Sequence, residues 1–338
     1  MDSLAPGVTV AAVWTGASDI ELRTVPIPEL GAGEVLVRVR LATVCGSDLH
    51  TVSGRRPAAC PSVLGHEAVG EVVGVGRDAN VQVGQRVIWS VTVACGTCGR
   101  CRSGRSAKCQ SVRKVGHEPF DGDWPLSGSY AAHAVLPRGT AIAVVPETLS
   151  DAVAAPAACA TATVMATLEA AGDLSGRRVL IGGAGMLGLT AVAACAEAGA
   201  RVQAVDIDAD RLAAVSMFGG RPADDAPVDV AIDYTGATIA VAAALARLDI
   251  GGTLVLAGSV TPGPPLAVDP ETVVRHWLTI TGVHNYEPRH LRRAVDFLDR
   301  TRDRYPWHSL VTPPVTLPEM ASALHPPPAG KLRRAISP

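Results

Sequence analysis

Four cysteines lie close together in the sequence and have the spacing of a metal site. They are Cys95, Cys98, Cys101 and Cys109, in the pattern Cys-x2-Cys-x2-Cys-x7-Cys. Four thiolates in tetrahedral geometry suit Zn²⁺ and close its coordination shell, so the predicted zinc is structural. A ferredoxin-type iron–sulfur cluster would need a shorter last spacing followed by proline, whereas Gln110 follows here. A nucleic-acid-binding zinc ribbon is disfavoured, because no second metal-binding half is present.

A second set of residues has the pattern of a dinucleotide-binding turn. The glycines of the G-x-G-x-x-G pattern are Gly183, Gly185 and Gly188. They follow the apolar run 178–181 and precede an alanine-rich stretch, which is the strand–turn–helix context that the pattern requires. Phosphate charge is expected to meet the helix N-terminus at Met186 and Leu187. A turn of an α/β protein that binds no nucleotide is the alternative.

Asp206 follows the next β-type run, 201–205. Its carboxylate is expected to accept hydrogen bonds from a ribose 2′-hydroxyl and to repel a 2′-phosphate, which favours NAD over NADP. Asp208 is a weaker candidate for the same role. Arg211 is a further predicted contact of the cofactor.

Cys45 and His66 are candidates for a second metal site. They stand in Cys45-Gly-Ser-Asp-Leu-His50 and in Gly65-His-Glu67, each at the end of a β-type run. Each signal is weak alone, because cysteine is commonly a small buried apolar residue and histidine is commonly a surface or hydrogen-bonded core residue. The residues by themselves leave open whether the pair binds a metal or packs.

The segments that must position these residues show two different secondary-structure patterns. Residues 8–145 show short β-type runs broken by glycine and proline, which predict an antiparallel, barrel-like domain. From residue 149 helical stretches alternate with β-type runs, which predicts βαβ units and a parallel sheet. Past residue 284 the composition is mixed again, with an amphipathic helix over 291–298. The predicted domains are 1–148 with 285–338, and 149–284.

Length, charge and composition narrow the class of protein. The 338 residues suffice for about two domains. The chain has 30 Lys and Arg residues and 32 Asp and Glu residues, which gives a formal net charge of −2. This balance lacks the excess of positive charge that is typical of proteins that bind nucleic acid. No transmembrane segment or secretory signal is recognised, and we expect a cytoplasmic protein without a membrane partner. In that compartment eight cysteines point to metal binding or catalysis rather than disulfides.

The ordered motifs resemble those of the zinc-containing medium-chain alcohol dehydrogenases over essentially the whole chain. The resemblance implies an α/β fold, with a Rossmann-type doubly wound parallel sheet that binds NAD and a β-rich, barrel-like (GroES-like) catalytic domain that carries the structural zinc lobe. It also implies a second, catalytic zinc with an open fourth position. The implied protein ligands are Cys45, His66 and Cys159, with Glu67 as an alternative oxygen ligand.

The same resemblance implies roles around the catalytic zinc. Asp48 would orient His66 through its other ring nitrogen. Ser47 and His50 would pass the substrate's hydroxyl proton toward solvent while a hydride moves to NAD. A solvated loop histidine is the alternative for His50. Two further cysteines have no motif partner and are expected to pack as apolar side chains, namely Cys60 and Cys195.

The resemblance implies that the substrate is a small alcohol or carbonyl compound. The stretches 114–130, 154–163 and 281–286 are similar to a subgroup associated with phosphonate catabolism, which implies a hydroxyphosphonate. A polyol or another secondary-metabolite alcohol is the alternative. Candidates for contacts with an anionic substrate are Arg55, Arg56, Arg113, Lys114 and His117. A homodimer or homotetramer is expected, with 278–281 as the edge strand.

Two other functions compete with this interpretation. A zinc-free reductase of the quinone-oxidoreductase type would share the fold, but it would lack the four-cysteine lobe and the Cys45 and His66 pair. A non-catalytic structural or binding protein would need only the core, and not the ligands or the nucleotide fingerprint.

Overall fold

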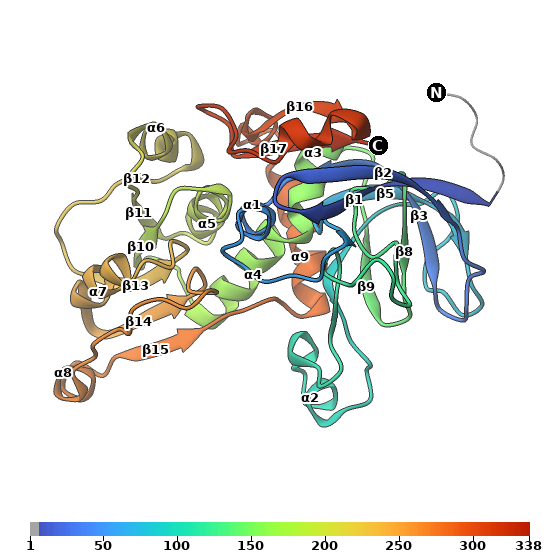
Figure 1. The fold of residues 1–338 in the computed structure, drawn as a ribbon. Coiled ribbons are helices and arrows are strands. Elements are labelled where there is room, and N and C mark those ends of the chain that lie inside the picture. Colours follow the sequence, from blue (N-terminus) through green and yellow to red (C-terminus); the bar gives the residue numbers. More distant parts are fainter. Residues whose placement is uncertain (1–6) are drawn as a thin grey trace. The chain divides into compact units, whose positions relative to one another are not determined.

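The computed structural model describes residues 7–338, which divide into two compact units (Figure 1). Unit 1 comprises the described residues up to Cys159, with Glu287–Arg300 and Trp307–Pro338. Unit 2 comprises Ala160–Tyr286 and Thr301–Pro306. The first six residues, on which the expectation about a secretory signal partly rests, lie outside the described residues.

Unit 1 is built on two mostly antiparallel sheets. The larger has the order β16-β17-β3-β5-β6-β7, with β8 paired to β3 and β9 to β6, and the smaller has the order β2-β1-β4. Among the described strands of these sheets, only β16 and β17 pair in parallel. The strands are β1 (Val8–Gly16), β2 (Asp19–Pro26), β3 (Val35–Thr43), β4 (Ser62–Val63), β5 (Ala68–Val75), β6 (Arg86–Val93), β7 (Arg113–Lys114), β8 (His133–Leu136), β9 (Thr140–Val144), β16 (Val311–Thr316) and β17 (Arg333–Ser337).

Strand β3 illustrates why this part of the chain forms sheets. Val35, Val37 and Val39 are buried, while Arg38 and Arg40, which point to the opposite face of the strand, are exposed. Side chains alternate between the two faces of a strand, so the valines line one face and pack into the core of unit 1. The β-rich, partly closed sheet predicted from the sequence is confirmed.

The helices of unit 1 are short, apart from α9. Helix α9 (Pro288–Thr301) contains the predicted segment 291–298 and is longer at both ends. Its buried residues follow the helical repeat and include Leu291, Val295 and Leu298. The others are α1 (Gly46–Val52), α2 (Gly99–Arg102), η1 (Ser106–Lys108), α3 (Asp151–Ala154), η2 (Ala155–Ala158), η4 (Trp307–Leu310) and η5 (Leu317–Ala323).

Unit 2 is a parallel sheet with the strand order β12-β11-β10-β13-β14-β15. In this order the chain starts at β10, moves outward, and returns to the other side at β13, which is the doubly wound Rossmann arrangement that the sequence predicts. The strands are β10 (Arg178–Gly182), β11 (Arg201–Val205), β12 (Arg221–Pro222), β13 (Val228–Asp233), β14 (Leu248–Leu256) and β15 (Thr279–Gly282).

Helices connect the strands of this sheet, as parallel pairing requires. Helix α5 packs against β10 and β11, and α7 packs against β13 and β14. The helices of unit 2 are α4 (Ala160–Ala171), which precedes β10, and α5 (Met186–Glu197), α6 (Ala209–Ala214), η3 (Val215–Phe218), α7 (Thr238–Ala246) and α8 (Pro270–Arg275). Within residues 7–338 no single helix is long and apolar enough to cross a membrane. Helices Asp151–Ala158 and Ala160–Ala171 together reach that length and apolar composition, but they are bent by 53° relative to each other.

Candidate active site

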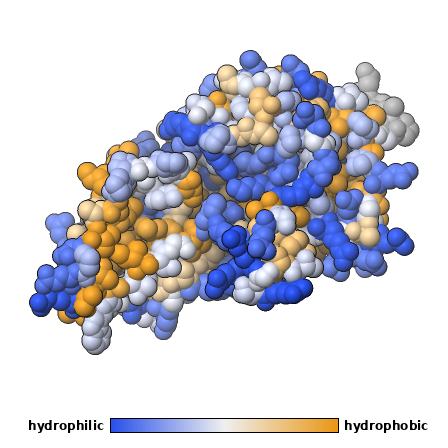
Figure 2. Space-filling view, turned by 60° about the horizontal axis from the view of Figure 1, so that its bottom comes forward, coloured by the Kyte–Doolittle hydropathy of each residue, from blue (hydrophilic) through white to orange (hydrophobic). Residues whose placement is uncertain are grey.

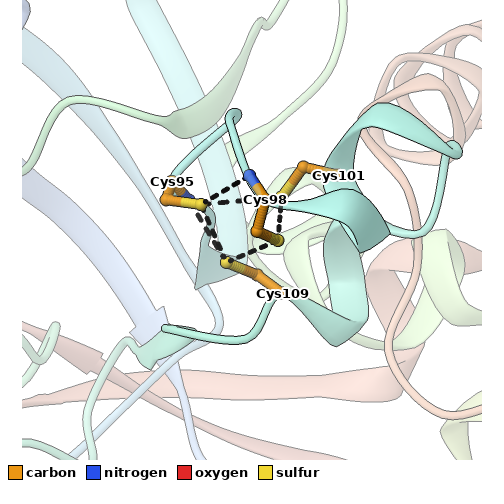
Figure 3. A group of neighbouring side chains, drawn as sticks. All are labelled: Cys95, Cys98, Cys101 and Cys109. Carbon is orange, nitrogen blue, oxygen red and sulfur yellow. Dashed lines mark hydrogen bonds between the residues drawn. The ribbon is translucent and has the colours of Figure 1, made fainter.

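The four cysteines of the predicted structural site converge in a loop that projects from the strands of unit 1 (Figures 1 and 3). Cys95 follows β6, Cys98 and Cys101 belong to the start and the body of α2, and Cys109 follows η1. The distances between sulfur atoms are 3.4 Å for Cys95 and Cys109, 3.5 Å for Cys98 and Cys101, 3.9 Å for Cys98 and Cys109, and 4.0 Å for Cys95 and Cys101. Tetrahedral zinc with bonds of about 2.3 Å requires about 3.8 Å between sulfurs. The four thiols therefore fit a zinc ion.

Backbone amides around the loop favour the ionised form of Cys95 and Cys98, whereas burial raises the pKa of Cys101 to about 12. Amide nitrogens of Cys98 and Cys95 lie 3.4 Å from the sulfurs of Cys95 and Cys109 respectively. Backbone and side-chain hydrogen bonds from Thr97 lower the pKa of Cys95 to about 5. Metal-binding cysteines must be thiolates, so the loop prepares the ligands.

A carboxylate that the sequence did not reveal anchors this loop. Glu287, directly before α9, accepts hydrogen bonds at 3.0 Å from the backbone nitrogens of Ser106 and Ala107, and another from the Ser106 hydroxyl. These amides are at the start of η1, where backbone donors lack helical partners. Glu287 therefore fastens the cysteine loop to a segment distant in sequence.

Cys45, His66 and Cys159 converge on a second point in unit 1. One ligand atom from each lies within 4.8 Å of the others. Cys45 is the N-cap of α1, His66 precedes β5, and Cys159 follows η2. Cys45 and His66 are buried, and Cys159 is half-buried. Two sulfurs and one imidazole leave a tetrahedral metal with one free position, which is the requirement of a catalytic zinc.

Asp48 lies behind His66. Its Oδ1 is 3.3 Å from His66 Nδ1, while its Oδ2 accepts hydrogen bonds of 2.9 Å from the Cys45 backbone nitrogen and from the Tyr130 hydroxyl. His66 Nε2 remains on the side of Ser47, whose Oγ is 3.2 Å away. The carboxylate therefore faces one ring nitrogen and leaves the other for a metal. Tyr130 was not identified from the sequence.

Glu67 is held by partners of its own. The Arg333 guanidinium donates to its two oxygens at 2.7 and 2.9 Å, and the Thr43 hydroxyl donates at 2.8 Å. Burial raises the pKa of Glu67 to about 7 even with Arg333 beside it. Arg333 Nη2 also lies 3.7 Å from the Cys45 sulfur. In this structure Glu67 faces Arg333, and the potential metal group contains Cys159 instead.

The predicted proton path is only partly assembled. Ser47 lies in the first turn of α1 beside His66, and His50 lies in the last turn of the same helix, half-buried. Among the described residues no hydrogen bond joins the Ser47 hydroxyl to the His50 ring. A mobile group such as the substrate or a solvent molecule would have to bridge them.

The predicted nucleotide turn lies between β10 and α5 in unit 2. Gly183 has a φ of 90°, a value that favours glycine. A Cβ on Gly188 would lie 1.7 Å from the Gly183 carbonyl oxygen, whereas one on Gly185, the N-cap of α5, would meet nothing within 4 Å. Gly188 thus permits close packing of helix on strand, and Gly185 leaves open space where a phosphate can approach. Met186 and Leu187 open the helix.

The Asp206 carboxylate is hydrogen-bonded to this turn. Its Oδ2 accepts a hydrogen bond of 2.6 Å from the Ala184 backbone nitrogen, and its Oδ1 accepts one of 2.8 Å from Asp208. Asp208 caps α6, and Arg211 pairs with Asp208 at 3.4 Å on an exposed part of that helix. Asp206 therefore stays beside the glycines, while Asp208 is occupied with the helix.

The two remaining cysteines differ from each other. Cys195 is fully buried in α5, in agreement with the expected packing role. Cys60 is exposed, so the expectation that it packs in the interior is wrong. It precedes a cis-proline, Pro61, in the irregular segment between α1 and β4. Neither belongs to a group that could hold a metal among the described residues.

Comparisons with known protein families match segments of both units. Residues 31–147 match the model of the alcohol dehydrogenase GroES-like domain, and residues 187–300 match the model of the zinc-binding dehydrogenases. The chain is 31 % identical over 288 residues to the L-threonine 3-dehydrogenase of Pectobacterium atrosepticum, covering 78 % of this chain and 75 % of the relative. It is 32 % identical to the same enzyme of Pectobacterium carotovorum, covering 78 % and 79 %.

Solved structures share the whole fold. An alcohol dehydrogenase from Thermotoga maritima superposes with a TM-score of 0.89 at 24 % identity, covering 98 % of this chain and 99 % of that one, which shows the fold alone. A zinc-binding dehydrogenase from Sinorhizobium meliloti bound to NADP has a TM-score of 0.86 at 26 % identity, with the same coverage. The chain therefore belongs to the zinc-containing medium-chain alcohol dehydrogenases, oxidoreductases that act on CH–OH donors with zinc and a nicotinamide dinucleotide.

Proposed function

We propose that this enzyme oxidises a small alcohol, or reduces the corresponding carbonyl compound, at a zinc ion held by Cys45, His66 and Cys159. The observation that carries the proposal is the convergence of these three side chains from distant segments. Zinc bound there would supply a Lewis acid that makes the substrate hydroxyl more acidic. A second zinc, held by Cys95, Cys98, Cys101 and Cys109, would be structural because four thiolates leave no open position.

The chain's own residues would handle the proton and the orientation of the ligands. Ser47 would accept the substrate's hydroxyl proton at Oγ while its own hydroxyl proton passes, through a bridging group, to His50, which would release a proton to solvent. Asp48 would keep the proton of His66 on Nδ1, so that Nε2 stays available. Glu67, bound to Arg333, would contribute negative charge near the site without ligating the metal.

We propose NAD rather than NADP as the cofactor, bound at Gly183, Gly185, Met186, Leu187 and Gly188. The position of Asp206 beside the glycine turn supports this choice, because a carboxylate repels a 2′-phosphate. Arg211, predicted as a contact, remains a weaker candidate since it pairs with Asp208. The NADP-bound relative makes the choice worth testing. Asp206→Ser should lower NADH affinity by about ten- to a hundred-fold in a fluorescence titration, and unchanged affinity would remove Asp206 from the ribose site.

For the domains, we propose that unit 1 is the catalytic domain and unit 2 the NAD-binding domain, close to the predicted ranges 1–148 with 285–338, and 149–284. The names of the relatives support L-threonine as one candidate substrate, and a small hydroxyphosphonate is the other. A cytoplasmic location is proposed because the metal-binding thiols must stay reduced.

A homodimer, or a homotetramer built from it, is proposed through the edge of the unit 2 sheet. Strand β15 pairs on one side only, with β14. Exposed apolar side chains near it include Ile250, Val274, Trp277 and Ile280. Figure 2 shows hydrophobic residues gathered at the left end of the view, where α8 and β15 lie in Figure 1. An unpaired edge with apolar neighbours suits pairing with a second copy, and light scattering of a Trp277→Lys variant tests it.

Metal analysis combined with an NAD-reduction assay over a panel of alcohols tests the proposed function. About two zinc ions per chain and turnover of at least one alcohol are expected. A chain with zinc and NAD binding but no turnover of any alcohol or carbonyl compound would support a non-catalytic role, and activity independent of zinc would support the quinone-reductase type.

A further inference from the structure

Two cations, Arg56 and Lys114, belong to segments that pack against the elements carrying Cys45 and His66. Among residues 7–338, neither Arg56 nor Lys114 forms an ion pair. The neighbouring Arg113 is different, because its guanidinium pairs with Glu118 at 3.4 Å and Asp123 at 2.6 Å and stacks on Trp124. Arg113 is thereby neutralised and is not available for an anionic ligand. Of the predicted anion contacts, Arg56 and Lys114 remain uncompensated and half-buried, whereas Arg55 is exposed.

Arg56 is tied to the helix that carries the site. The chain leaves α1 and reverses at Gly54, which has a φ of 75°. The Arg56 backbone nitrogen then donates to the His50 carbonyl oxygen at 3.1 Å. Arg56 also lines a surface hollow together with Thr51 and Pro57, so a ligand can reach it from solvent.

Lys114 is tied to the segment that carries His66. It ends β7, and the next residues turn so that Gly116 lies against Gly65, where a Cβ would be 2.5 Å from the Gly65 carbonyl oxygen. This contact brings the His117 ring to 5.6 Å from the His66 ring, measured between centroids. Lys114 therefore stands at the base of a turn that packs directly against a proposed zinc ligand.

The two cations affect each other across this space. Burial, and next the charge of Arg56, lower the pKa of Lys114. Two partly desolvated like charges without a counter-charge raise the free energy of the protein that has no anion bound. Binding of an anion lowers this free energy. The Nδ1 of His117 lies 2.7 Å from the Val115 carbonyl oxygen, which can only accept, so in a neutral His117 ring the proton is on Nδ1. Its Nε2 is then an acceptor for a hydroxyl or ammonium group.

We propose that Arg56 and Lys114 bind an anionic group of the substrate, so that the enzyme acts on alcohols whose carbinol lies near a carboxylate or a phosphonate. Arg56 can form two parallel hydrogen bonds to such a group, and Lys114 adds a point charge. His117 Nε2 accepts a hydrogen bond from a neighbouring donor of the same substrate. This inference rests on the proposed dehydrogenase function and narrows its substrate class.

The test compares Arg56→Gln and Lys114→Met with Arg55→Gln, which removes the same charge from an exposed neighbouring position. Three alcohols of equal length are assayed for NAD reduction: a hydroxyphosphonate, a hydroxycarboxylate and an uncharged secondary alcohol. The wild type should prefer a charged substrate. Each of the first two variants should raise the KM for the charged substrate by about ten- to a hundred-fold and leave the KM for the uncharged alcohol unchanged. The Arg55 variant should match the wild type, and the better of the two charged substrates identifies the anion.

A binding measurement separates this inference from the proposed function. Calorimetry with methylphosphonate and with acetate on the zinc-containing protein should show binding that both variants weaken. If the uncharged alcohol is oxidised but anion binding is equal in wild type and both variants, the anion site is wrong and the dehydrogenase stands. If no alcohol is oxidised but anion binding depends on Arg56 and Lys114, the proposed function is wrong and the anion site stands. An Arg55→Gln effect as large as that of Arg56→Gln would also overturn the inference.

Discussion

The two cysteine-containing groups of unit 1 are assembled in different ways. Cys95, Cys98, Cys101 and Cys109 come from one short loop, and their sulfurs are brought together by local turns and backbone amides. Cys45, His66 and Cys159 come from three distant segments, and buried partners hold them. A local group depends on its loop, whereas a distant group depends on the packing of the whole unit.

This difference predicts which property each group controls. A loop that has little apolar core of its own needs its metal to stay folded. The distant group is surrounded by a packed core that includes Trp89 and Tyr130, so that part of unit 1 can fold without a metal. Substitutions in the loop should therefore reduce stability, and substitutions in the distant group should mainly reduce activity.

The largest expected effect is the loss of activity in His66→Ala. Removing a ligand of an open zinc site should lower kcat/KM by about a thousand-fold or more. The protein should remain folded, bind NADH and keep about one zinc per chain. Activity, circular dichroism and metal content measure these three properties, with the exposed His325→Ala as the control. A protein that unfolds in His66→Ala would contradict the distinction between the groups.

Arg333→Met tests whether buried partners support the distant group. It would leave Glu67 buried without its counter-charge and should destabilise the protein by about 3–5 kcal/mol in urea unfolding. Replacing both residues, as in Arg333→Met with Glu67→Leu, should recover part of this loss, because no charge is then left unpaired. A double variant as unstable as the sum of the single variants would show that the pair acts independently.

Cys98→Ser should affect stability rather than chemistry. Loss of one of four thiolates should lower the melting temperature by about 5–10 °C and the zinc content to about one per chain. Substrate turnover by the fraction that remains folded should change little. Cys60→Ser is the matched control, since Cys60 is exposed and belongs to no metal group, and its melting temperature should equal that of the wild type.

The smallest effect concerns the attachment of the loop. Glu287→Gln keeps one accepting oxygen but removes the charge that the Ser106 and Ala107 amides bind, so about 1–2 kcal/mol of stability should be lost. The melting temperature should fall by a few degrees. Glu29→Gln, at an exposed position, is the control. If Glu287→Gln has no effect while Cys98→Ser does, the loop is stabilised by its metal and not by its anchor.

Residues that act within a short stretch could be recognised from the sequence. The cysteine spacing, the glycine pattern and the order of β-type and helical stretches each predict a local geometry, and the observed strands β10 and β11 begin where the sequence predicts. Partners that meet across the fold could not be recognised. Arg333 contacts Glu67, 266 positions away, and Glu287 contacts Ser106, 181 positions away, without a shared motif.

The sequence by itself determined the kinds of chemistry, because thiolate spacing, glycines at a strand–helix turn and alternating apolar residues follow from local stereochemistry. Only the tertiary structure decided which distant side chains share a site. It joined Cys159 to Cys45 and His66, directed Glu67 to Arg333, neutralised Arg113 and, within residues 7–338, left the side-chain charges of Arg56 and Lys114 without an ion pair. The physical reason is that ion pairs and desolvation depend on distances between segments, and those distances are set by the packing of the core.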